Sequence, residues 1–261
     1  MIISIFNLKG GCTKTATTIN LGHALARLSK RVLLVDMDFQ MNTTSTLYGQ
    51  EVSQSKSLYQ FLDPSIEKID PKSCIVSTGY SNLHLLPSGK KLLSLEPHLI
   101  LNAPKSWTLF RDRFREYAIK NYDYTLIDNH PALGVFTISS LTASDFAIIP
   151  NEAGSRYNIE GLGDAIDLFN DIKNQENSHL KKLKILISKV DRRIKNHLAS
   201  IEQLNDFMDK EFLFKTIIPS NADIQNAEAK GVTVFAYRSN ATSAKAYTKL
   251  AKELIKETEN V

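Results

Sequence analysis

Short runs of apolar residues alternate along the chain with longer segments in which apolar residues recur at helical spacing. The short runs are mostly continuous, a pattern typical of parallel strands that are covered on both faces. We therefore predict strands at Ile2–Phe6, Val32–Asp36, Leu83–Leu86, Tyr124–Asp128, Phe146–Pro150, Leu183–Ser188 and Phe214–Pro219. Helices are predicted at Thr15–Leu28, Ser106–Lys120, Glu160–Asn174, Ile194–Asp209 and Ala241–Glu257.

This alternation of strands and helices predicts an α/β fold. Right-handed crossovers between successive strands would build a single doubly wound, mostly parallel sheet flanked by helices. No linker rich in Pro, Gly or Ser divides the 261 residues, so we predict one domain spanning residues 1–261. Ligands of such sheets bind at the carboxyl ends of the strands. Candidate chemistry is therefore expected directly after each strand.

Charge and cysteine content exclude several classes of protein. The net charge is only +4, and 43% of the residues are hydrophobic, which excludes a charged disordered tail and a histone-like coat. Two cysteines, Cys12 and Cys74, are too few and too far apart for a disulfide framework or a zinc ribbon. The N-terminal apolar run is short for a signal peptide, and no stretch approaches the length of a membrane span. We expect a cytoplasmic protein.

The turn after the first strand has the composition of a phosphate-binding loop. Gly10 and Gly11 would let backbone N–H groups converge on phosphate oxygens at the start of a helix. Lys14 would reach the β- and γ-phosphates, and the hydroxyl of Thr15 would bind Mg²⁺. The pattern G-x-x-x-x-G-K-[ST] is not met, because Leu8 and Thr13 occupy its glycine positions. By itself this segment also fits a plain strand-to-helix turn.

Two further predicted strands end in aspartate residues. Asp36 and Asp38 lie two residues apart at the end of one strand, so they point toward one site. Asp128 ends another apolar strand and is followed by Asn129, His130 and Pro131. Buried carboxylates are costly unless a metal, water or hydrogen bonds receive them. The alternative for the first pair is an N-cap role before the segment Thr43–Leu47.

Taken together, the segment Lys9-Gly10-Gly11-x-x-Lys14-Thr15 and the acidic strand ends resemble the deviant Walker A ATPases of the ParA/MinD group, and most closely the ParA family. The resemblance implies a P-loop NTPase fold, ATP and Mg²⁺ as cofactors, and Mg²⁺-dependent ATP hydrolysis. It implies that Lys9 reaches the ATP of a partner subunit and that Asp38 orients the attacking water. Catalytic roles are thus predicted for Lys9, Lys14 and Asp38.

The same resemblance supplies the remaining nucleotide and metal residues. Gln40 would lie near the nucleotide, and the segment with Pro219 and Asn221 would lie beside adenine. The predicted nucleotide-binding set is Lys9, Gly10, Gly11, Cys12, Thr13, Lys14, Thr15, Ala16, Gln40, Pro219 and Asn221. The predicted metal set is Thr15, Asp36, Asp38 and Asp128.

Several positions depart from the family pattern. Thr13 stands where the family has glycine, and Cys12 stands where valine or serine is commoner. Phe39 replaces the usual proline between Asp38 and Gln40, and His130 lies where the family has Asp-Thr-Pro-Pro. A side chain at position 13 demands a backbone conformation that glycine tolerates better. We interpret His130 as a variable neighbour of the site.

The positive charge is concentrated in the last third of the chain. Residues 181–261 hold 15 basic and 10 acidic residues, a net charge of +5, whereas the rest carries −1. Members of the resembled family bind nonspecific DNA as ATP dimers through basic residues in this region, and such contacts are salt-sensitive. The candidate DNA-binding residues are Arg192, Arg193, Lys195, Lys230, Arg238, Lys245 and Lys249.

The resemblance also implies partners and a place in the cell. We expect an ATP-dependent homodimer that is associated with the nucleoid and segregates or positions a plasmid or chromosome. A ParB-like or other small cargo-adaptor protein would stimulate the ATPase. Positioning of a protein organelle such as the carboxysome, by the same mechanism, is the alternative.

Three other classes of protein fit the sequence less well. A MinD-like membrane ATPase would need a C-terminal amphipathic helix with bulky anchors, but the tail Ala251–Val261 has no aromatic residue, so no membrane partner is expected. An iron–sulfur reductase would need paired cysteines, and a dethiobiotin synthase-like ligase would keep a conventional loop. A degenerate protein that holds ATP and hardly hydrolyses it is a further alternative.

Overall fold

The computed structural model describes residues 1–49, 52–67, 69–154 and 158–259. Its centre is a seven-stranded sheet in the order β3-β4-β2-β5-β1-β6-β7, in which β3 pairs antiparallel with β4 and the other pairs are parallel. The strands are β1 (Ile2–Ile5), β2 (Val32–Met37), β3 (Val76–Ser77), β4 (Leu83–Leu86), β5 (Tyr124–Asn129), β6 (Phe146–Glu152) and β7 (Lys182–Ser188). The predicted mostly parallel, doubly wound sheet is confirmed.

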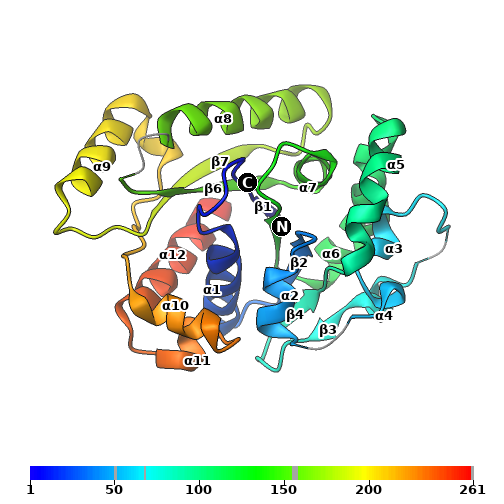
Figure 1. Cartoon of the computed structure of the whole chain (residues 1–261), viewed down its shortest axis with the longest axis horizontal. Helices are drawn as coiled ribbons and strands as arrows, with labels where there is room; N and C mark the ends of the chain where they lie inside the picture. The colour runs from blue at the N-terminus through cyan, green and yellow to red at the C-terminus, as the bar shows by residue number, and fades with distance from the viewer. Residues whose placement is uncertain (50–51, 68, 155–157, 260–261) are drawn as a thin grey trace.

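Helices cover both faces of this sheet (Figure 1). One layer contains α1 (Lys14–Arg27), α11 (Val234–Arg238) and α12 (Thr242–Thr258), and the other contains α6 (Leu109–Asn121), α7 (Val135–Ala143) and α8 (Asn158–Gln175). The remaining α-helices are α2 (Asn42–Leu47), α3 (Tyr59–Leu62), α4 (Pro71–Cys74), α5 (Glu96–Leu101), α9 (Lys195–Phe207) and α10 (Ala222–Ala229). Short 3₁₀ turns lie at Gln54–Lys56, Lys90–Leu95, Lys105–Thr108 and Lys210–Phe212.

Alternate residues of each strand supply the two faces of the core. Ile3 and Leu34 pack with α1 and α12, whereas Ile2 and Leu33 pack with the aromatic side chains of α6. Every residue of β1 and β2 is buried, which explains why these strands read as continuous apolar runs. Leu250 and Leu254, the apolar positions of the last helix, are fully buried in this core. Both cysteines are buried thiols, and no helix among the described residues is long and apolar enough to cross a membrane.

One predicted strand is wrong. The segment 214–219 makes only isolated bridges, at Leu213 and Pro219, and is not a strand. The backbone N–H groups of Lys215 and Thr216 instead donate to the two carboxylate oxygens of Glu253 on α12, at 2.6 and 2.9 Å. The N–H groups of Phe214 and Ile218 still donate to the carbonyl oxygens of Ile185 and Ile187 on β7, so the distant Glu253 side chain interrupts the pairing with β7 between them. The strand β3 and the helices α3–α5, α7, α10 and α11 were not predicted.

A buried histidine joins α1 to α11 and makes stability depend on pH. His23 Nδ1 lies 2.7 Å from Thr233 Oγ1, and burial, with a smaller effect of Arg27, lowers the pKa of His23 to about 4. Between pH 4 and the ordinary value of 6.5 the unfolded chain therefore binds a proton that the folded chain does not. The free energy of unfolding should fall as the pH is lowered through this window.

We expect His23→Gln to flatten that pH dependence, because glutamine does not titrate there. Urea unfolding at about pH 7 and about pH 5 measures the difference in free energy for each variant. His98→Gln, at an exposed position of α5, is the matched control and should keep the wild-type dependence. An unchanged dependence in His23→Gln would contradict the assignment.

Candidate functional site

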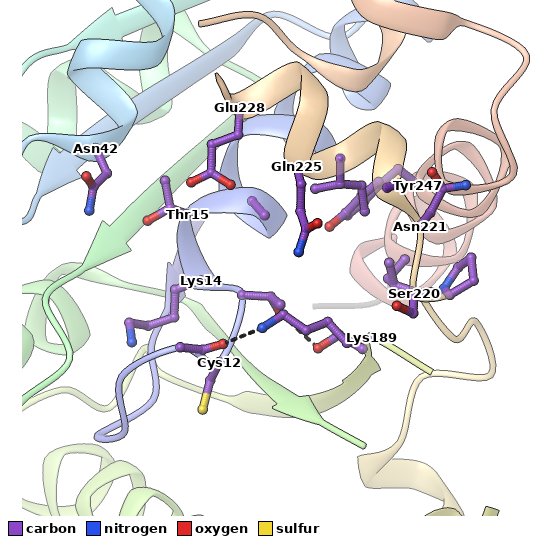
Figure 2. Close-up of a pocket in the computed structure, with 18 of the residues that line it drawn as sticks. Cys12, Lys14, Thr15, Asn42, Lys189, Ser220, Asn221, Gln225, Glu228 and Tyr247 are labelled. Carbon is purple, nitrogen blue, oxygen red and sulfur yellow. Dashed lines mark hydrogen bonds between the residues drawn. The ribbon is translucent and has the colours of Figure 1, made fainter. Parts of the chain in front are cut away.

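A cavity of about 530 Å³ opens at the carboxyl end of β1. The loop Gly11–Thr13 and the first residues of α1 form one wall, and α10 with the segment Ile218–Asn221 forms the opposite wall. Figure 2 shows Gln225 and Glu228 of α10 pointing toward the loop that carries Cys12 and Lys14. The cavity lies where a ligand of a doubly wound sheet binds.

The loop after β1 is held in shape by side-chain hydrogen bonds and contains one residue in a strained backbone conformation. Lys14 Nζ donates to the carbonyl oxygen of Lys9 at 3.0 Å, closing the loop on itself. Thr13 is left-handed, with φ of 59°, and this conformation costs a non-glycine residue about 1 kcal/mol or more. The glycine expected at this position by the family pattern thus has a direct conformational reason. Thr13 Oγ1 lies 2.8 Å from Ser188 Oγ, which holds the threonine in place.

Residues at the end of β7 support the same loop. The sequence did not predict this support. Lys189 Nζ donates to the carbonyl oxygen of Gly11 at 3.1 Å and pairs with Glu152 at 3.2 Å. The backbone of Lys189 is also in the left-handed region, with φ of 53°. Its side chain lies against the phosphate-type loop in Figure 2. Because the peptide group is planar, fixing the Gly11 carbonyl also fixes the direction of the Cys12 N–H. Ser188 and Lys189 therefore belong to the site.

Two fully buried carboxylates lie side by side beneath the loop. Asp36 of β2 and Asp128 of β5 are paired residues in the sheet register. Burial raises the pKa of Asp36, and the charge of Asp128 raises it further, against hydrogen bonds from Thr44. Burial likewise raises the pKa of Asp128, whereas hydrogen bonds from Thr43 and Thr15 oppose the rise. This concentration of acidic groups favours a cation nearby.

Lys14 is the cation that the described residues bring closest to these carboxylates. Its side chain is buried, and burial lowers the pKa of Lys14 while Asp128 and, more weakly, Asp38 raise it. Among the described residues no cluster of three or more His, Cys, Asp or Glu side chains is suited to hold a metal.

Asp38 lines the cavity and contacts a residue that we interpreted as a variable neighbour. Asp38 Oδ1 accepts a hydrogen bond from the backbone N–H of Gln40, and it lies 2.8 Å from His130 Nδ1. The ring of His130 lies over that of Phe39, with centroids 4.2 Å apart. His130 is thus a direct partner of the predicted catalytic carboxylate.

The structure brings most, but not all, of the predicted nucleotide residues to the cavity. Those that line it are Gly11, Cys12, Thr13, Lys14, Thr15, Ala16, Pro219 and Asn221, and Asp38 of the predicted catalytic and metal sets lines it too. Lys9, Gly10, Gln40, Asp36 and Asp128 are not among its lining residues. Asp36 accepts hydrogen bonds from Thr44 and from the Asp38 N–H, so it braces the turn after β2. Asn221 caps α10 by accepting from the Asp223 N–H.

Several lining residues carried no recognisable signal in the sequence. Asn42 of α2, Gln225 and Glu228 of α10 and Tyr247 of α12 are not among the residues to which the motifs assign a role, although Asn42 closely follows Gln40 and Gln225 closely follows Asn221. Thr43 and Thr44 also belong to the site, since they donate to Asp128 and Asp36. The hydroxyl pair directly after a D-x-D segment was the one available signal for them.

The candidate DNA-binding residues are all exposed. Three have partners: Arg193 pairs with Asp191, Arg238 pairs with Asp223, and Lys230 lies over the ring of Tyr237. Arg192, Lys195, Lys245 and Lys249 form no ion pair among the described residues. Lys182 and Lys184 contributed to the basic composition of this region, but both form ion pairs with Glu257. They are therefore not candidates for DNA binding.

Comparison with known proteins agrees with this architecture. A family model described as an AAA domain matches residues 1–185. The sporulation initiation inhibitor protein Soj of Bacillus subtilis is 34% identical over 253 residues, covering 97% of each chain. The chromosome partitioning protein ParA of Myxococcus xanthus is 31% identical over 257 residues, covering 98% of this chain and 88% of that protein.

Solved structures show the same fold. Apo McdA of Cyanothece superposes with a TM-score of 0.83 at 21% identity, covering 97% of this chain and 98% of that one. MinD of Pyrococcus horikoshii, complexed with Mg-ADP, has a TM-score of 0.77 at 25% identity, covering 98% and 96%. The family model and the near full-length similarity to relatives that are more than 30% identical show that this chain belongs to the ParA/MinD family of P-loop ATPases.

Proposed function

We propose that this chain is an ATP-driven switch of the ParA type. It binds ATP with Mg²⁺, pairs with a second copy as an ATP-sandwich dimer, and in that state binds DNA without regard to sequence. Hydrolysis returns monomers and releases the DNA, and the cycle segregates or positions a cargo such as a plasmid or chromosome. The observation that carries this proposal is the cavity that joins Lys14 and Thr15 to Asp38 and to the segment Ile218–Asn221.

The residues of the cavity fit a nucleoside triphosphate. Backbone N–H groups of the loop and Lys14 would neutralise phosphate oxygens, and the start of α1 adds its partial positive charge. The adenine and ribose would occupy the side formed by Pro219, Asn221 and α10. Lys9 would contact the phosphates of the partner subunit.

The acidic pair fits the metal. Two buried carboxylates with raised pKa values lie beside Thr15, and a divalent cation held there directly or through water would offset their mutual repulsion. Thr15 would bind the ion, and Asp36, Asp38 and Asp128 would hold its waters. When bound, Mg²⁺ supplies charge neutralisation at the transferred phosphoryl group.

Asp38 would hold the attacking water. In hydrolysis the water oxygen forms a bond to the γ-phosphorus, the bond from that phosphorus to the bridging oxygen breaks, and its electron pair leaves with ADP. The water proton passes to Asp38 or a phosphate oxygen. Phosphoryl transfer depends mainly on positioning and charge, so a fixed carboxylate and a closed loop are the main requirements.

DNA binding would use the exposed cations Arg192, Arg193, Lys195, Lys230, Arg238, Lys245 and Lys249. Fluorescence anisotropy with random duplex DNA tests DNA binding in the presence of ATP, in the presence of ADP and without nucleotide. We expect binding only in the presence of ATP, and we expect the logarithm of the binding constant to fall linearly with the logarithm of the salt concentration. Lys245→Ala with Lys249→Ala should reduce the salt slope by about 2 for each subunit that contacts the DNA, whereas Lys120→Ala, at an exposed position of α6, should leave the slope unchanged. Equal affinity with ATP and ADP would contradict the proposal.

The cargo would be recruited through a ParB-like or other small adaptor protein that stimulates hydrolysis. A DNA-bound dimer would be found on the nucleoid in the cytoplasm. Affinity capture with a hydrolysis-deficient variant, in the presence of ATP, would identify the adaptor.

A further inference from the structure

Two of the departures from the family pattern contact one another. Phe39 follows β2 and His130 follows β5, and these strands are neighbours, with Met37 of one paired to Asn129 of the other. The rings of Phe39 and His130 lie 4.2 Å apart between centroids and are tilted by 35°. The imidazole also reaches Asp38, with Nδ1 2.8 Å from Oδ1. A change at one strand end is therefore matched by a change at the other.

The hydrogen bonds of Asp38 fix one oxygen and leave the other available. Oδ1 accepts from the backbone N–H of Gln40 at 2.8 Å and is the atom that faces His130 Nδ1. No described residue donates a hydrogen bond to Oδ2. A carboxylate held through one oxygen keeps a fixed plane, so the position of the second oxygen is also set. That is the geometry needed to hold a water in one place.

The imidazole is itself held in place. The side chain of Asp38 is 6% exposed and that of His130 is 23% exposed, so both have restricted freedom. Phe39 packs against one face of the His130 ring, and Pro131 next to it lines the cavity. Since an aspartate carboxylate only accepts, the Nδ1–H of His130 must be the donor in this contact.

We propose that His130 is a positioning residue for ATP hydrolysis: it fixes the Asp38 carboxylate so that Oδ2 accepts a hydrogen bond from the attacking water, while Phe39 fixes the imidazole. This inference rests on the proposed function, in which Asp38 holds that water. His130 acts through Asp38 and is not itself a lining residue of the cavity. In this chain the donor from the neighbouring strand replaces the rigidity that a proline at position 39 would give the turn.

Substitutions at His130 separate this role from simple packing. Asparagine places an N–H donor the same number of bonds from the backbone as Nδ1, but it has no ring. His130→Ala removes both the donor and the ring. A positioning role predicts that asparagine restores the rate, whereas a packing role predicts that it does not.

Single-turnover hydrolysis and ATP affinity give the readout on the full-length protein. We expect His130→Ala to slow hydrolysis about 10- to 100-fold, as misplaced catalytic groups do, while the dissociation constant for ATP stays within about twofold. His130→Asn should recover to within about threefold of wild type. Asp38→Ala with His130→Ala should be no slower than Asp38→Ala alone, because His130 then has nothing to position.

Three results would overturn the inference: a wild-type rate in His130→Ala, a rate in His130→Asn as low as in His130→Ala, or additive losses in the double variant. Phe39→Leu, which removes the ring contact and keeps the hydrogen bond, should give a smaller loss than His130→Ala, and a larger loss would count against it. A different result would contradict the proposed function itself: hydrolysis of ATP at the wild-type rate by Asp38→Ala.

Discussion

Lys14→Ala is expected to reduce ATP affinity by about 100-fold or more, since a charge-assisted contact to phosphate is worth about 3 kcal/mol. Lys14 is buried in the wall of the cavity, where the penalty of desolvating its charge is already present in the free protein. Burial lowers the pKa of Lys14 despite the opposing effect of Asp128, so a bound phosphate would add an anionic partner to the one hydrogen bond with the Lys9 carbonyl oxygen. Titration calorimetry with ATP measures the loss.

The folded state should survive this substitution. Among the described residues, Lys14 Nζ donates a hydrogen bond only to the carbonyl oxygen of Lys9, so truncation removes one hydrogen bond and one buried charge. Thermal melts without nucleotide should stay close to those of wild type, while the stabilisation on adding ATP should disappear. Lys120→Ala, at an exposed position of α6, is the matched control and should keep both. Retained ATP binding in Lys14→Ala would reject the phosphate-loop assignment.

Asp38→Ala is expected to bind ATP normally and to lose hydrolysis, with a single-turnover rate lower by about 10²- to 10⁴-fold, the range given by loss of a positioned proton acceptor. The carboxylate lines the cavity but does not belong to the loop that would hold the phosphates. With hydrolysis blocked, the ATP-bound dimer should accumulate and stay on DNA. Light scattering after size exclusion, with ATP and duplex DNA, measures both states.

Asp167→Ala on α8 is the control, since it removes an exposed carboxylate on another face. It should cycle between monomer and dimer as wild type does. If Asp38→Ala remains monomeric with ATP, the role assigned to Asp38 is wrong. If it dimerises without binding DNA, the basic residues, and not the catalytic site, need reassignment.

The order of strands and helices followed from periodicity because each central strand is buried on both faces. β1 and β2 contain no exposed residue, so their apolar runs are unbroken and easily recognised. The segment 214–219 had the same composition and is not a strand, because Glu253 from a helix far along the chain binds its N–H groups. Competition for backbone donors by a distant carboxylate leaves no local signal.

The sequence by itself determined the fold class, the phosphate loop and the acidic strand ends, because residues directly after parallel strands necessarily meet at one edge of the sheet. It also marked Thr13, Phe39 and His130 as unusual. Only the tertiary structure decided what these residues do. Side chains from separate strands meet through sheet register, so the contact of His130 with Asp38 and the support of Gly11 by Lys189 have no signature in sequence spacing.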